Sequence, residues 1–181
     1  MVERLRKVVA IILLILIFFV IYFLQSNFFT WFTIGTVQPN LFVIFILVIG
    51  LFAGKKIGIV LGIVFGFYID FVIGRQVGIS GIMLGIVGLI GEILDKNFSK
   101  ESRLTIMLMI AGCTAIFEIG CYIFNVMTLE MNFEILAFIK ILLIEIIYNL
   151  IITIIIYPIV QKAGHSLEDT FKTKKILTRY F

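Results

Sequence analysis

The chain has 181 residues, of which 62% are hydrophobic and 14% charged, and its formal net charge is +4. About half of the residues of a soluble domain are apolar, so this composition indicates an integral membrane protein. The longest stretch outside the hydrophobic segments is residues 161–181. That stretch is too short for a nucleotide-binding fold, a soluble catalytic domain or a nucleic-acid-binding module.

Six hydrophobic segments predict membrane-spanning helices, at about 8–24, 39–55, 57–73, 78–94, 104–127 and 135–160. Each approaches the ~20 apolar residues that cross a bilayer. The first follows a basic N-terminus but precedes no small-residue cleavage site, so we expect a retained span and not a signal peptide. A short turn at 54–56 separates the second span from the third, and a partly re-entrant hairpin, giving five spans, is the alternative. The predicted fold is all-α: a polytopic membrane protein with a single bundle over residues 1–160.

The basic residues predict the orientation of this bundle. Thirteen of the 15 Lys and Arg residues precede the first span, or lie at 55–56, at 96–103 or in the tail 161–181. By the positive-inside rule, both termini are therefore predicted to be cytoplasmic. The loops at 25–38, which is rich in aromatic residues, and at 129–134 are then outside. The tail is predicted to be a basic amphipathic helix that begins near Ser166 and lies on the lipid surface, with a cytoplasmic protein partner as the alternative.

Small residues form rows on the third and fourth spans. The row on the third span and its extension recurs every four residues and consists of Gly58, Gly62, Gly66, Asp70, Gly74 and Gly78. This spacing places the row on one helical face, where a neighbouring backbone can approach closely. A second row, of glycines alone, follows at positions 81, 85, 88 and 91. The rows predict tight helix packing or contact with a partner helix.

Four ionisable or amide side chains inside the spans are further candidates: Asp70, Glu118, Glu145 and Asn149, with Lys140 near the start of the last span. An ionisable group in a span costs on the order of 3 kcal/mol to insert and must face protein or water. Asp70 is predicted to pair with Arg75 or Lys140, or to be a carboxylate at a helix end. Glu118, Glu145 and Asn149 predict either a polar cavity for a substrate or hydrogen bonds between helices.

Catalytic patterns are incomplete. The sequence Gly78-Ile79-Ser80-Gly81 matches a short motif around the nucleophile of rhomboid intramembrane proteases, but the single histidine, His165, lies in the tail. An aspartyl intramembrane protease needs two aspartates that share a site, and the spans hold only Asp70. The chain has no metal-binding Cys/His motif and no P-loop. We therefore expect no enzyme, no cofactor and no metal.

The motifs between residues 39 and 78 resemble those of the rod-shape-determining protein MreD family. Pro39 and Asn40 at the start of the second span match a Pro-Asn pair of that family, and Gly62, Gly66, Asp70, Gly74 and Gly78 match its Gly/Asp pattern. Length, hydropathy and short loops agree over nearly the whole chain. The fifth and sixth spans carry no motif of the family, so the resemblance gives no role to Glu118 or Glu145.

The resemblance implies a non-enzymatic membrane scaffold of the cell-wall elongation complex. It would bind MreC, act indirectly with MreB, RodA and the transpeptidase partner of RodA, and support peptidoglycan synthesis and rod shape. The resemblance also implies a six-helix bundle similar to the substrate-binding components of energy-coupling-factor transporters. Such a vitamin-binding component is the alternative function, and it would need a ligand pocket near the outer face.

Overall fold

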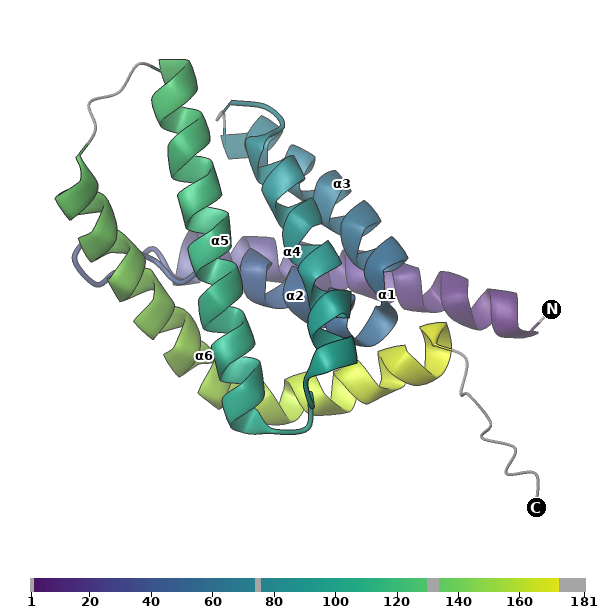
Figure 1. The fold of residues 1–181 in the computed structure, drawn as a ribbon. Coiled ribbons are helices and arrows are strands. Elements are labelled where there is room, and N and C mark those ends of the chain that lie inside the picture. The colour runs from purple at the N-terminus through teal and green to yellow at the C-terminus, as the bar shows by residue number, and fades with distance from the viewer. Residues whose placement is uncertain (1, 74–75, 130–133, 173–181) are drawn as a thin grey trace.

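The computed structural model describes residues 2–73, 76–129 and 134–172. These ranges form six α-helices, as the sequence predicted, and Figure 1 shows how they pack as a bundle. A π-helical turn, η1, extends the first helix, and a single bridge joins Ile34 to Val37. The helices are α1 Val2–Phe23, α2 Leu41–Ala53, α3 Lys55–Ile73, α4 Ile79–Asn97, α5 Arg103–Leu129 and α6 Ile135–Phe171.

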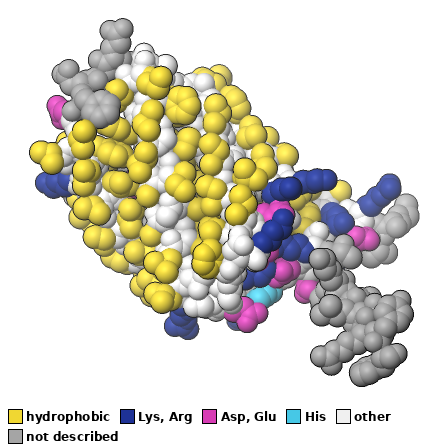
Figure 2. Space-filling model, viewed as in Figure 1, with side chains coloured by type: hydrophobic (Ala, Val, Ile, Leu, Met, Phe, Trp, Pro, Cys, Tyr) yellow, Lys and Arg dark blue, Asp and Glu magenta, His cyan; other side chains and the backbone are white. Residues whose placement is uncertain are grey.

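Several of these helices fit a multi-pass membrane protein. Helices α3, α5 and α6, and α1 with its π-helical extension, are long and apolar enough to cross a membrane. Figure 2 shows a surface covered largely by hydrophobic side chains, with charged side chains gathered near the end of α6. We call the end of the bundle that carries Asp95, Lys100 and Lys172 the basic end, and the end that carries Trp31 the aromatic end.

Helix α2 is the centre of the bundle. All of its 13 residues except Phe45 are buried, and it packs against the other five helices. Such burial suits a helix that is apolar on every side. Its length corresponds to ~20 Å, well below the ~30 Å of a bilayer core. The span predicted at 39–55 is therefore a shorter helix than expected. The turn predicted at 54–56 is reduced to Gly54, which has a φ of +92°, because Lys55 already begins α3.

The glycine row on α3 packs against α4 within the same chain. A Cβ added at Gly62 would lie 2.5 Å from the carbonyl oxygen of Leu84, and one at Gly66 would lie 2.5 Å from the Cα of Gly81. Gly58 similarly contacts the backbone at Gly88. Only glycine permits two helix backbones to approach this closely. Of the remaining members, Gly78 lies in the turn before α4 and Gly74 lies outside the described residues.

Helix α6 continues beyond the predicted span. It contains Pro158 and ends at Phe171, so no new helix begins at Ser166. Proline has no N–H to donate to the carbonyl four residues earlier and bends a helix, and Figure 1 shows the last part of α6 turning across the basic end. We call residues 159–172 the strap. Its Gly164 is buried, and a Cβ there would lie 2.7 Å from the Phe52 ring, so the strap packs on protein. The remainder of the predicted tail, 173–181, lies outside the described residues.

Candidate functional site

A cavity of about 490 Å³ lies above the N-terminus of α2. Helix α2 begins at Leu41, next to Asn40, whose N–H donates to Asn149, the fifteenth residue of α6. The loop before α2 and helices α2 to α6 contribute to the walls of the cavity. Its polar lining consists of Gln25, Ser26, Thr30, Thr36, Gln38, Asn40, Ser80, Glu118 and Glu145.

The floor of the cavity is the capped N-terminus of α2. The Asn40 N–H donates to Asn149 Oδ1 at 2.7 Å, and the Leu41 N–H donates to Gln25 Oε1 at 3.2 Å. The Asn40 side chain accepts from the Val43 N–H, and Pro39 has no N–H to satisfy. Amides at a helix start that lack water need such partners. The Pro-Asn pair singled out in the sequence thus begins a helix inside the bundle.

Asn149 joins three helices below the cavity. It is fully buried, and its Nδ2 donates to Thr114 Oγ1 of α5 at 2.9 Å while its Oδ1 holds the start of α2. The Thr153 hydroxyl donates to the Asn149 carbonyl at 2.6 Å. The bonds to Thr114 and to the start of α2 are hydrogen bonds between helices, which the sequence offered as one alternative for this residue, whereas the Thr153 bond lies within α6.

Glu118 and Glu145 both line the cavity, from α5 and α6. Glu145 is 6% exposed and Glu118 is half-buried. The sequence offered a cavity lined by Glu118, Glu145 and Asn149 as one alternative to hydrogen bonds between helices. The two glutamates do line one cavity, whereas Asn149 is not among its lining residues. Lys140 is exposed on α6 and is not among the lining residues.

Asp70 binds the start of α4, the helix that contributes Ser80 and Leu84 to the cavity lining. It is fully buried, and its Oδ2 accepts from the Gly78 N–H at 2.8 Å and the Ser80 N–H at 3.0 Å. Its Oδ1 has no hydrogen-bond partner among the described residues. Of the two predicted counter-charges, Arg75 lies outside the described residues, and no ion pair joins Lys140 to Asp70 within the described ranges. Asp70 lies in the last turn of α3 and accepts from the amides that begin α4, which is the position expected of a carboxylate at a helix end. The predicted pairing with Arg75 stays a prediction.

The rim of the cavity carries a strained turn that sequence analysis missed. Gly35 and Thr36 have φ of +57° and +72°, and Ile34 and Val37 exchange two backbone hydrogen bonds on either side of them. Positive φ at both central residues is typical of a type I′ turn. A β-branched residue such as Thr36 rarely adopts this conformation. The signal available in the sequence was Gly35 alone, and the loop was interpreted only as an aromatic belt.

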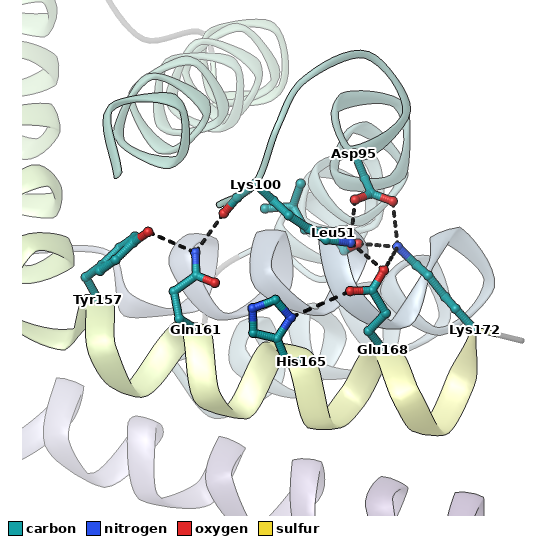
Figure 3. A network of polar contacts seen from close by, with 8 residues as sticks. All are labelled: Leu51, Asp95, Lys100, Tyr157, Gln161, His165, Glu168 and Lys172. Carbon is teal, nitrogen blue, oxygen red and sulfur yellow. Dashed lines mark hydrogen bonds and ion pairs between the residues drawn. The ribbon is translucent and has the colours of Figure 1, made fainter. Parts of the chain in front are cut away.

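A second polar cluster, also absent from the sequence predictions, lies at the basic end (Figure 3). Lys100 Nζ lies 2.7 Å from Asp95 Oδ1 and 2.6 Å from Glu168 Oε1, and Lys172 Nζ lies 2.6 Å from Asp95 Oδ2. Burial by itself raises the pKa of Asp95, but hydrogen bonds from Lys100 and Lys172 outweigh it and hold that pKa below its usual value. Burial lowers the pKa of Lys100, and its bonds to Asp95 and Glu168 reverse the shift and raise it.

The family model described as rod shape-determining protein MreD matches residues 6–164. The chain belongs to the MreD family. The match extends from α1 into the strap and confirms the resemblance inferred from the Pro-Asn pair and the Gly/Asp row. Membership implies a role in rod-shape determination, and MreD proteins are shape-determining membrane proteins.

Searches of curated proteins and of solved structures gave no match to this MreD-family chain. The expected likeness to the substrate-binding components of energy-coupling-factor transporters therefore stays a prediction. Chemically, the described lining of the cavity supplies carboxylate, amide and hydroxyl groups, which can accept several hydrogen bonds from one donor-rich group. This lining is suited to binding.

Proposed function

We propose that this MreD-family protein is a non-enzymatic scaffold of the cell-wall elongation complex and that it binds MreC through the cavity above α2. The cavity supports this proposal because it is a concave, half-polar surface of about 490 Å³, within the usual range of binding pockets. Through MreC the scaffold would act with MreB, RodA and the transpeptidase, and would support peptidoglycan synthesis.

The cavity replaces the glycine row as the proposed contact with the partner. Gly58, Gly62 and Gly66 lie against the α4 backbone, so a partner helix would reach them only after α3 and α4 had separated. The cavity needs no such rearrangement, because its lining residues Ser26, Thr30 and Thr36 are exposed. A membrane-proximal segment of MreC with Lys, Arg or free N–H groups would complement Glu118 and Glu145.

The proposed orientation places both termini in the cytoplasm and the aromatic end on the outer face. The concentration of Lys and Arg on the N-terminal segment, at 55–56, at 96–103 and in the tail supports it. Exposed aromatic side chains such as Trp31, which is 88% exposed, suit the boundary between lipid and water on the outer side of the membrane. The cavity would then open toward the compartment in which peptidoglycan is assembled.

Co-purification with MreC tests the proposal. The double variant Glu118→Gln/Glu145→Gln keeps the shape of the cavity and removes both carboxylates, so we expect at least ten-fold lower recovery of MreC at normal membrane abundance, together with rounding of rod-shaped cells. Glu134→Gln is the matched control, because Glu134 is exposed and lies outside the cavity lining. Wild-type recovery of MreC by the double variant would contradict the cavity as the contact. A small molecule retained in the cavity, without MreC, would favour the vitamin-binding alternative.

A further inference from the structure

The strap is held to the bundle by side chains from both of its ends. Near its end, Glu168 and Lys172 pair with Lys100 and Asp95 across the α4–α5 connection (Figure 3). Near its start, Gln161 Nε2 donates to the Lys100 carbonyl at 2.7 Å. Three of the four charged side chains in this network are 13–25% exposed and the fourth, Glu168, is 32% exposed. The network therefore lies between the strap and the bundle and not on an open surface.

Helix α6 contacts the central helix α2 at both ends. Asn149 accepts from the N–H of Asn40, the residue that caps the start of α2, and 23 residues later Lys172, the residue that follows α6, donates from its Nζ to the Leu51 carbonyl at 2.5 Å. The last carbonyls of a helix have no partner inside it and need one from elsewhere. Gly164 of the strap packs against the Phe52 ring between these two points. One helix therefore satisfies polar groups at each end of the buried helix.

This arrangement connects the strap to the cavity. Helix α2 is almost wholly buried, and a close-packed helix of this kind transmits a displacement along its length with little internal deformation. Its first residues include Phe42, which lines the cavity, and the outer half of α6 supplies Glu145 to the same lining. A displacement of the strap that frees the Leu51 carbonyl would shift both of these lining elements.

We propose that the strap is a latch whose docking at the basic end sets the shape of the cavity at the aromatic end. With Lys172 and Glu168 docked, α2 and α6 are held in register and the cavity has the form seen here. With the strap released, α2 loses its partner at Leu51 and the cavity loosens. Coupling of this kind is reciprocal, so an occupant of the cavity would also strengthen strap docking.

Thiol labelling in the cavity tests the latch. Ser80 is 5% exposed and lines the cavity, so Ser80→Cys reports its opening, in a background with Cys113→Ala and Cys121→Ala. A small methanethiosulfonate reagent is applied to the full chain in detergent, and hydrogen exchange of the strap amides is recorded in parallel. Lys172→Gln should speed both strap exchange and labelling at position 80 by at least five-fold. Lys162→Gln, the same charge change on the exposed side of the strap, should alter neither.

The two readouts separate the parts of the proposal. Faster strap exchange with unchanged labelling would overturn the coupling, and unchanged strap exchange would overturn the latch itself. If Lys172→Gln does not accumulate in the membrane, Glu168→Gln replaces it, because that variant removes one charge and keeps an acceptor for Lys100. Neither readout requires MreC, so the outcome is independent of the proposed partner.

Discussion

Asp70 and Glu92 cap opposite ends of the same antiparallel helix pair. Asp70 of α3 accepts from the N–H groups that begin α4, and Glu92 of α4 accepts from the Lys55 N–H that begins α3. Each carboxylate lies at the positive end of its partner's helix dipole. The glycine rows lie between these caps, so the two helices are fixed in register by their ends and held close by their faces.

Replacing Asp70 separates the contribution of its charge from that of its hydrogen bonds. Asp70→Asn keeps an acceptor for Gly78 and Ser80 and should lower the free energy of unfolding by about 1 kcal/mol, whereas Asp70→Leu leaves buried N–H groups without a partner and should cost about 2–4 kcal/mol. Thermal unfolding in detergent and membrane abundance measure both. Wild-type stability of Asp70→Leu would contradict a capping role.

The glycine row can be tested against a glycine outside it. Gly66→Ala places a Cβ 2.5 Å from backbone atoms of α4, so it should lower the unfolding temperature and the membrane abundance. Gly112→Ala is the matched control, because no atom lies within 4 Å of a Cβ there. In that helix interior alanine should be neutral, or stabilising by up to about 1 kcal/mol. Equal effects of the two changes would contradict close packing at Gly66.

The turn at the cavity rim predicts a stabilising substitution. Thr36→Gly removes the strain of a β-branched residue at φ of +72° and should raise the unfolding free energy by about 1 kcal/mol. Differential scanning fluorimetry measures the change. A lower unfolding temperature would mean that contacts of the Thr36 side chain outweigh the strain.

The charge network at the basic end predicts a pH range for strap docking. The pKa of Asp95 is lowered from 3.8. The stability that the Asp95 carboxylate contributes is therefore complete above pH 3.8 and is lost as the pH falls through the lower pKa of the folded state. The pKa of Lys100 is raised from 10.5. The stability that the Lys100 ammonium contributes is therefore complete below pH 10.5 and is lost as the pH rises through the higher pKa of the folded state.

Stability from these two groups should therefore be constant between about pH 5 and pH 9 and fall in strong acid. The unfolding temperature measured across this range, for the wild type and for Asp95→Asn, provides the check. Because Asp95→Asn has no carboxylate to protonate at this position, its unfolding temperature should fall less in acid than that of the wild type. Identical acid profiles for the two proteins would show that Asp95 does not contribute.

Sequence alone determined the features that depend on local pattern. A nearly continuous apolar composition predicts membrane helices because the bilayer requires the backbone to satisfy its own hydrogen bonds. The fourfold spacing of Gly58, Gly62 and Gly66 predicts one close-packing face, since that spacing keeps them on one side of a helix. Gly62 and Gly66, continued at the same spacing by Asp70, Gly74 and Gly78 and preceded by Pro39 and Asn40, were enough to indicate the family.

Tertiary structure decided everything that depends on partners distant in the chain. Where α2 begins, at the floor of the cavity, depends on Asn149 accepting from Asn40, 109 residues away. The sequence left open whether Asp70 pairs with a basic residue or is a carboxylate at a helix end, and only the tertiary structure shows that the amides of α4 donate to its Oδ2. A helix start carries partial positive charge, which favours a carboxylate there. The direction of the strap is set by the contact of Lys172 with Leu51 across 121 residues. The sequence pattern shows which polar groups need a hydrogen-bond partner, whereas the packing of the helices determines which residue that partner is.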